Sequence, residues 1–395
     1  MSFVRILISA GEASGEMYGA QLMEALRRLA GESPATTLNQ KLEFFGVGGD
    51  RMRAADCDTI VDARDLAVVG ISEILSHLPK IWGLFHKLIA EADKRKPDLA
   101  IVIDSPAFNW RVARQMHKRG IPVVYYVCPQ FWAWRQGRVR LLRKYVDKAL
   151  VIFPFEEKFY RDRGVDASFV GHPLADLPRP EGDRAEYAAQ YHLDASKLWI
   201  TVMPGSRVKE VRMNMPGIQE SVAKLGPGYE YLLPVAPTLD RTFLRSLIAD
   251  NNSIRLVPET LLALALSRAG IVASGTATVE AAMMGTPFVM VYRVSPMTYR
   301  LGRSRVKVPF FAMVNLIAGK EVVPELVQQD FTAENVVARL QAVMVDGPAR
   351  EKMLAGLAGV KASLQGEMQD QRHPADRAAE AVMAQLGAGW MSKTG

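Results

Sequence analysis

The feature that most constrains the fold is a repeated alternation between short, continuous apolar segments and longer helix-like segments. Continuous apolar runs are typical of strands buried on both faces, and helices between them indicate a parallel sheet covered on both sides. We therefore predict an α/β protein with doubly wound parallel sheets. The predicted strands are 4–8, 42–47, 99–103, 123–127, 150–153, 199–203, 231–235, 254–257, 270–273 and 288–292.

A length of 395 residues is sufficient for two domains of this kind. A Pro-rich, polar stretch at 172–183 interrupts the alternation and predicts an interdomain linker. We expect an N-terminal Rossmann-like domain at 1–172 and a C-terminal one at 173–345, facing each other across a cleft. The remaining segment, 346–395, is predicted to be helical and to cross back to the N-terminal domain or to contact a partner.

The composition is that of a soluble globular protein, with 49% hydrophobic and 23% charged residues. The sequence has no apolar run of the roughly 20 residues that span a bilayer and no signal-like N-terminus, so we expect a cytoplasmic location. Two cysteines, Cys57 and Cys128, are too few for a disulfide framework. A net charge of +7 favours anionic partners, which include nucleic acid, nucleotide-like substrates and an acidic membrane surface.

Residues 269–292 predict a compact strand–turn–helix–turn–strand unit. The small-residue turn of Ser274, Gly275 and Thr276 opens the helix, followed by Ala277, and the main-chain N–H groups there can face a phosphate at a positive helix end. Glu280, a few residues further on, can accept hydrogen bonds from ribose hydroxyls. An ordinary turn with an acid favoured by the helix dipole explains the same residues, and this stretch alone leaves both interpretations open.

A second turn of this type follows the predicted strand 199–203 and consists of Gly205, Ser206 and Arg207. The guanidinium of Arg207 can bind a phosphate with two parallel hydrogen bonds. Two such turns in one half of the chain favour a nucleotide diphosphate site. The glycine patterns of P-loop enzymes and of ordinary dinucleotide folds do not occur in the sequence.

Polar residues also follow the predicted strands of the N-terminal half, where ligands of open α/β sheets bind. Asp104 ends an apolar strand and is the preferred candidate for a general base, although a helix N-cap is the alternative. Glu12 is the second candidate, or else a structural contact of its Gly-rich turn. The pair Asp56 and Asp58 matches a metal-binding D-x-D pattern, but we interpret it as a surface loop and expect no metal and no cofactor.

Basic and apolar residues in the N-terminal half predict contact with an anionic membrane. The basic run at 135–148 lies beside Phe131, Trp132 and Trp134. Five apolar residues fall outside the helical stripe that a sheet can bury, and we predict that they contact lipid acyl chains. A helix packed on two sides or a homodimer contact is the alternative. These five residues are Val68, Val69, Ile71, Leu75 and Trp82.

Eight motifs together make the chain closely resemble the lipid-A-disaccharide synthase family, inverting glycosyltransferases with the two-Rossmann GT-B architecture. They are A-G-E-A-S-G-E (10–16), V-V-G-I-S-E-I-L (68–75), I-D-S-P-A-F-N (103–109), F-W-A-W-R-Q-G-R (131–138), V-G-H-P (170–173), P-G-S-R (204–207), A-S-G-T-A-T-V-E (273–280) and N-L-I-A-G-K-E-V-V-P-E-L (315–326). Departures from the usual pattern include Glu16, Asp50, Ala107 and Val314, most of them near the expected acceptor side.

The resemblance implies transfer of 2,3-diacylglucosamine from its UDP donor to 2,3-diacylglucosamine 1-phosphate at the inner membrane, without a metal. It implies that Arg207 and the turn at 274–277 hold the diphosphate, that Glu280 binds ribose and that Asn315 faces the sugar or phosphate. Asp104 would deprotonate the acceptor hydroxyl and Glu12 would position the sugar. One rival interpretation is another GT-B enzyme acting on UDP-amino sugars, such as a UDP-N-acetylglucosamine 2-epimerase or the lipid-linked muropeptide glycosyltransferase. The other is a basic nucleic-acid-binding protein, which the phosphate turns disfavour.

Overall fold

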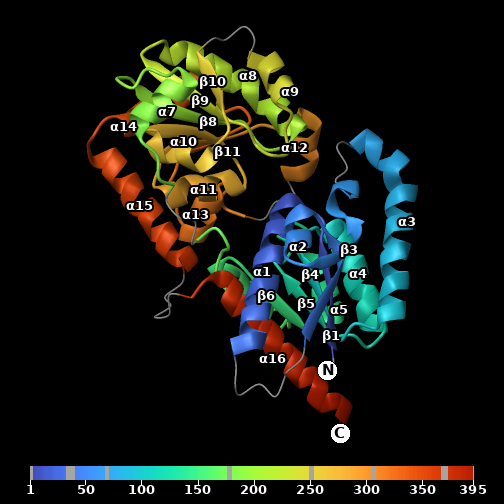
Figure 1. The fold of residues 1–395 in the computed structure, drawn as a ribbon. Coiled ribbons are helices and arrows are strands. Elements are labelled where there is room, and N and C mark those ends of the chain that lie inside the picture. The colour runs from blue at the N-terminus through green and yellow to red at the C-terminus, as the bar shows by residue number, and fades with distance from the viewer. Residues whose placement is uncertain are drawn as a thin grey trace. The chain divides into compact units, whose positions relative to one another are not determined.

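A computed structural model of the chain describes residues 3–32, 41–66, 71–175, 180–248, 253–303, 308–365 and 372–394. The chain divides into two compact units (Figure 1). Unit 1 comprises residues 1–173 and 368–395, and unit 2 comprises residues 174–367. Each unit is built on its own parallel sheet.

Unit 1 contains a seven-stranded parallel sheet in the order β3-β2-β1-β4-β5-β6-β7. The strand order reverses direction at β1 and β4, which are neighbours in the sheet and pair from Ile6 with Leu99 to Ala10 with Ile103. The strands are β1 (Phe3–Ala10), β2 (Lys41–Gly48), β3 (Cys57–Asp62), β4 (Leu99–Ile103), β5 (Val123–Tyr126), β6 (Lys148–Val151) and β7 (Ala167–Phe169).

The helices of unit 1 cover both faces of this sheet, as right-handed crossovers in two opposite directions require. Apolar side chains of α3, α4 and α5 form one buried cluster with the sheet, while α1, α2 and α16 pack together. The bounds are α1 (Ala13–Glu32), α2 (Asp50–Ala54), α3 (Ile71–Arg95), α4 (Pro106–Lys118), α5 (Val139–Tyr145), α6 (Pro154–Arg161) and α16 (Pro374–Thr394), with short 3-10 turns at Ala63–Asp65 and Gln136–Arg138.

Unit 2 contains a six-stranded parallel sheet in the order β10-β9-β8-β11-β12-β13. Its strands are β8 (Leu198–Met203), β9 (Tyr229–Pro234), β10 (Ile254–Val257), β11 (Ala269–Ala273), β12 (Phe288–Tyr292) and β13 (Glu325–Val327). Its helices are α7 (Arg184–Tyr191), α8 (Val208–Leu225), α9 (Arg241–Ile248), α10 (Thr260–Leu266), α11 (Thr276–Met284), α12 (Pro296–Arg303), α13 (Met313–Ala318), α14 (Ala333–Met344) and α15 (Pro348–Gln365).

The strands absent from the sequence prediction lie at the edges of the sheets. They are β3, β7 and β13, and each is short or carries exposed polar residues, so the continuous apolar signal is missing. One expectation is corrected here: Cys57 and Asp58 begin the edge strand β3 and do not belong to a loop.

The last segment of the chain is divided between the units, with α15 in unit 2 and α16 in unit 1. Helix α16 (red in Figure 1) packs against α1. The buried Arg377 on α16 donates from Nε to the main-chain oxygen of Val170 at 2.8 Å. Gly171 has φ +90°, and a Cβ added there would lie 2.3 Å from Arg377 Nη2. The V-G-H-P motif is therefore where α16 docks on unit 1.

Candidate active site

Asp104 and Ser105 form a strained turn between β4 and α4. Both residues have left-handed backbone conformations, with φ of 47° and 45°, and Pro106 then begins the helix. Such conformations in residues other than glycine persist only where the surrounding structure holds them, and they concentrate at functional sites. The side chain of Asp104 is half-buried at the carboxyl end of the strand.

The buried side chain of Asn109 holds this turn in place. Its Nδ2 donates to the main-chain oxygens of Ile103 at 2.8 Å, Asp104 at 3.0 Å and Ser9 at 3.1 Å. Its Oδ1 accepts a hydrogen bond of 2.7 Å from the Ser9 hydroxyl. Asn109 thus ties the ends of β1 and β4 together. Sequence reasoning did not assign it, although it closes the I-D-S-P-A-F-N motif.

Glu12 lies two residues beyond the end of β1 and is exposed. A Cβ on the preceding Gly11 would lie 2.6 Å from Ser105 Oγ, so only glycine lets the two turns approach this closely. Burial, and after it the negative charges of Asp104 and Glu12 among other groups, raises the pKa of Tyr125. The Tyr125 hydroxyl donates to the main-chain oxygen of Asp104 at 2.8 Å. Both predicted acids therefore lie near the same buried tyrosine, which the sequence analysis did not identify.

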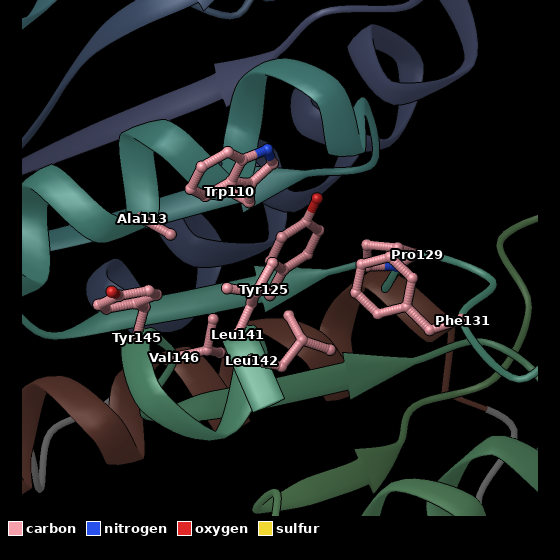
Figure 2. A pocket seen from close by; sticks show the side chains of 9 residues that line it. All are labelled: Trp110, Ala113, Tyr125, Pro129, Phe131, Leu141, Leu142, Tyr145 and Val146. Atoms are coloured by element: carbon pink, nitrogen blue, oxygen red, sulfur yellow. The ribbon is translucent and has the colours of Figure 1, made fainter. Parts of the chain in front are cut away.

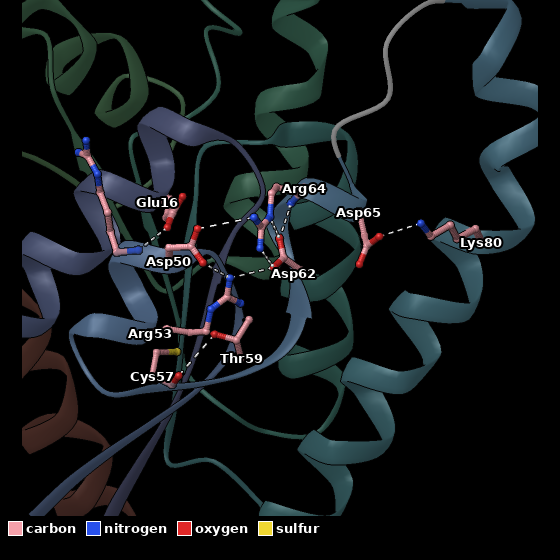
Figure 3. Close-up of polar contacts among 10 residues, drawn as sticks. Glu16, Asp50, Arg53, Cys57, Thr59, Asp62, Arg64, Asp65 and Lys80 are labelled. Atoms are coloured by element: carbon pink, nitrogen blue, oxygen red, sulfur yellow. Dashed lines mark hydrogen bonds and ion pairs between the residues drawn. The ribbon is translucent and has the colours of Figure 1, made fainter. Parts of the chain in front are cut away.

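The Gly48–Gly49 turn after β2 packs on Glu16 of α1. A Cβ on Gly49 would lie 2.5 Å from Glu16 Oε1, and that oxygen accepts a hydrogen bond of 2.8 Å from the main-chain nitrogen of Arg51 (Figure 3). Glu16, one of the departures from the family pattern, thus connects α1 to the start of α2. Its side chain stabilises the turn.

A surface network of ion pairs lies beside this turn (Figure 3). Arg53 contacts Asp50 at 2.6 Å and Asp62 at 2.9 Å, and Arg64 contacts Asp62 at 2.8 Å. The hydrogen bond from Arg64 is the largest cause that lowers the pKa of Asp62. Asp50, a second departure from the family pattern, is therefore paired with Arg53. The network stabilises the fold at this turn.

The carboxylates of the D-x-D pattern also have cationic partners. Asp56 contacts Arg27 at 3.2 Å, and Asp58 contacts Arg95 at 2.6 Å. The two carboxylates are held by arginines from α1 and α3, and within the described ranges no group of three or more histidine, cysteine or acidic side chains could hold a metal ion.

The F-W-A-W segment after β5 is anchored by a buried carboxylate. Glu156 accepts hydrogen bonds from Trp132 Nε1 at 2.8 Å and from the main-chain nitrogens of Ile152 at 3.1 Å and Phe153 at 3.0 Å. Burial raises the pKa of Glu156 to about 7. Trp132 is consequently a core residue, whereas Trp134 is 47% exposed. Only part of the predicted aromatic surface is available to a ligand.

A small apolar cavity lies between α4, β5 and α5 (Figure 2). Its volume of about 10 Å³ leaves room for a single water at most. Trp110, Tyr125, Phe131 and Tyr145 are among its lining residues. It is a gap in side-chain packing and not a sugar site.

In unit 2, the turn of Gly205, Ser206 and Arg207 connects β8 to α8, as predicted. Gly205 has φ +129°, and the Arg207 side chain is 71% exposed. Asn214 donates from Nδ2 to the main-chain oxygen of Pro204 at 2.8 Å, and its Oδ1 accepts from the nitrogen of Arg293 at 2.9 Å. The buried Asn214 therefore fixes the turn relative to the segment after β12.

The second predicted turn connects β11 to α11. Gly275 is the N-cap with φ +136°, a conformation that glycine adopts without strain, and no atom of the described residues outside the turn and its helix backbone lies within 4 Å of a Cβ placed there. Ser274 is held by a hydrogen bond from its hydroxyl to the oxygen of Phe311 at 2.8 Å. The space beside Gly275, in the direction of a side chain, is therefore open.

Glu280 is half-buried on the second turn of α11. Burial raises the pKa of its carboxyl. Its carboxylate has no hydrogen bond or ion pair with any residue that the structure describes. A carboxylate in this position retains its full capacity to accept hydrogen bonds from a ligand.

Asn315 has a different role from the one expected. It is fully buried, and its Nδ2 donates to Val323 O and Glu325 Oε1, both at 2.8 Å. Its Oδ1 accepts from the nitrogens of Val322 at 2.7 Å and Val323 at 3.0 Å. An amide has two donors and two acceptor positions, all of which are used here. Asn315 therefore organises the 319–325 loop and offers no polar atom to the sugar or phosphate.

The predicted acyl-contact residues are described only in part. Val68 and Val69 lie outside the described residues, and Ile71 and Leu75 lie in α3 without described side chains. Trp82 is 55% exposed on the same helix and stacks on Phe85 at a ring distance of 5.4 Å.

The fold and the strand-end residues place the chain in the GT-B class, which is built from two Rossmann-like units. The glycotransferase of kitacinnamycin has the same fold, with a TM-score of 0.61, 14% identity and coverage of 97% of this chain and 99% of that chain. The UDP-N-acetylglucosamine 2-epimerase from Neisseria meningitidis, solved with UDP-GlcNAc bound, gives a TM-score of 0.58 at 10% identity, covering 98% and 99%. At these identities the likeness concerns the fold alone.

Sequence similarity defines the family. The model of the lipid-A-disaccharide synthetase family matches residues 6–379. The lipid-A-disaccharide synthase of Koribacter versatilis (strain Ellin345) is 53% identical over 384 residues, which cover 96% of this chain and 98% of that protein. The chain belongs to the lipid-A-disaccharide synthetase family and is a glycosyltransferase.

Proposed function

We propose that the protein transfers 2,3-diacylglucosamine from UDP-2,3-diacylglucosamine to the 6-hydroxyl of 2,3-diacylglucosamine 1-phosphate, with inversion at the anomeric carbon and without a metal. The observation that carries the proposal is the family match, because it spans both groups of strand-end residues. The residues that we assign to the reaction are Asp104 and Glu12 of unit 1, and Arg207, Glu280 and the turn at Gly275 of unit 2.

In the proposed reaction, Asp104 accepts the proton of the acceptor hydroxyl as the oxygen attacks the anomeric carbon. The bond from that carbon to the UDP oxygen breaks on the opposite face, and the configuration inverts. Negative charge then develops on the diphosphate. Arg207, the main-chain N–H group of Ser206 and those at the start of α11 stabilise this charge, and Glu280 orients the nucleotide through its ribose. The charge compensation that a metal could provide thus comes from the protein.

The test combines both lipid substrates with the purified protein in the presence of EDTA. We expect the disaccharide 1-phosphate by mass spectrometry and a β-linkage by NMR, because an inverting displacement changes the α-configuration of the donor. A requirement for magnesium or manganese would contradict the metal-independent mechanism. Conversion of the UDP-sugar in the absence of acceptor would favour the epimerase alternative.

Membrane association is the second part of the proposal, and it is supported by charge on unit 1. Within the described residues no helix combines the length and apolar character that a membrane span requires. Five of the cations in the predicted basic run, all but Lys148, are exposed, and none of the five forms an ion pair within the described ranges. They are Arg135, Arg138, Arg140, Arg143 and Lys144. Neighbouring α4 adds the exposed Arg114 and Lys118, and α3 adds Trp82.

Replacing Arg140, Arg143 and Lys144 by Gln is expected to weaken binding to anionic vesicles by roughly 100-fold, since each of the three surface cations contributes ~1 kcal/mol. Cosedimentation with phosphatidylglycerol vesicles measures the loss. The matched control replaces Arg241, Arg245 and Arg339, exposed cations of unit 2, by Gln. Equal loss in the control would show that net charge alone is responsible, and unchanged binding of the first variant would contradict a basic membrane face.

A further inference from the structure

The carboxylate of Glu210 accepts hydrogen bonds from the groups of Ser206 and Arg207 that the proposed function assigns to binding the diphosphate. Its Oε1 accepts a hydrogen bond of 2.9 Å from Arg207 Nη1, and its Oε2 accepts one of 3.3 Å from the main-chain nitrogen of Ser206. A Cβ placed on Gly205 would lie 2.9 Å from Glu210 Oε2. The side chain therefore covers the turn between β8 and α8.

This arrangement differs from ordinary helix capping. Arg207 is the N-cap of α8, and Glu210 occupies the third helical position. In a capping box a glutamate at that position accepts from the N-cap residue's own N–H group. Here it reaches one residue further back, to Ser206, whose main-chain oxygen is held by Thr238 Oγ1 at 2.5 Å. The contact with Ser206 is thus directed at the turn itself.

The two donors differ in how many acceptors they can serve. The guanidinium of Arg207 has five N–H groups, so it can contact Glu210 and a phosphate at once. The main-chain N–H group of Ser206 has a single hydrogen, which a carboxylate and a phosphate oxygen cannot both take in good geometry. A phosphate on this turn must therefore displace Glu210 or lie beside a second anion.

We infer that Glu210 is an internal competitor of the diphosphate, which lowers the affinity for UDP and speeds release of UDP after transfer. The inference rests on the proposed function, because it takes Ser206 and Arg207 as phosphate-binding groups. In the proposed reaction Glu210 lies beside the groups that bind the nucleotide's phosphates. Its charge therefore lowers the affinity for ligands that carry phosphate and leaves the affinity for the nucleoside alone unchanged.

The experiment titrates UDP and uridine into the full-length wild-type protein and into Glu210→Gln, which keeps the size of the side chain and removes its charge. We expect Glu210→Gln to bind UDP about fivefold more tightly, the scale for one nearby charge. Stopped-flow displacement should show correspondingly slower UDP release. Uridine affinity should not change. Glu210→Ala, which removes the acceptor as well, should show the same direction of change.

Glu334→Gln is the matched control, because Glu334 forms an ion pair with Lys224 on another surface of unit 2. It should leave UDP affinity unchanged. Weaker or unchanged UDP binding in both Glu210 variants, with their fold intact by circular dichroism, would overturn the inference and would leave the proposed function standing. Absence of UDP binding in the wild type and in every variant would overturn the proposed nucleotide site, and the inference with it.

Discussion

Replacement of Asp104 by Asn is expected to lower kcat by about 100-fold or more, with little change in UDP affinity. Asparagine keeps the size of the side chain but cannot accept the acceptor's proton. The strained main chain at 104 and 105 is held by Asn109 and Tyr125 through main-chain oxygens, so the turn should survive the substitution. Steady-state kinetics together with a UDP titration measure both quantities.

Asp98→Asn is the matched control for this prediction. Asp98 lies just before the opposite end of β4, where its carboxylate accepts a hydrogen bond of 3.0 Å from the Arg5 nitrogen. It should leave kcat unchanged. If Asp104→Asn retains near-normal kcat while Glu12→Gln loses activity, Glu12 is the base. Loss of activity in Asp98→Asn as well would indicate that disturbing β4 suffices to inactivate the protein.

Replacing either Arg207 or Glu280 by Ala is expected to weaken UDP binding by roughly 1–3 kcal/mol, the scale of a charged hydrogen bond left unmade. Arg207 would lose its contacts with the phosphates, and its removal also leaves Glu210 without a cation at 2.9 Å. Glu280 would lose the ribose hydroxyls. Because Glu280 has no partner among the described residues, its replacement should alter ligand binding more than stability.

Isothermal titration with UDP and uridine separates the two contributions. The Glu280 variant should lose affinity for both ligands, whereas the Arg207 variant should lose affinity mainly for UDP. Arg339→Ala, an exposed arginine on α14, is the control for loss of a positive charge in unit 2. Unchanged UDP titrations in both variants would remove these residues from the nucleotide site.

The sequence by itself determined the architecture and most of the strands. The apolar runs at 99–103, 254–257 and 288–292 coincide with β4, β10 and β12. This was possible because parallel strands buried on both faces are continuously apolar, a property that local sequence displays. The turn positions at 104, 205 and 275 followed from the same pattern, since polar and small residues come where such strands end.

The tertiary structure alone decided how those residues are held. The expected ligand contact of Asn315 became a buried brace because Val322, Val323 and Glu325 use all its hydrogen bonds. Tyr125 and Asn109 gained their positions near Asp104 from neighbouring strands and a following helix. Glu210 reached the Ser206 turn through the winding of α8. Hydrogen-bond partners depend on side-chain direction and on contacts between distant segments, and neither is encoded in the spacing of residue types along the chain.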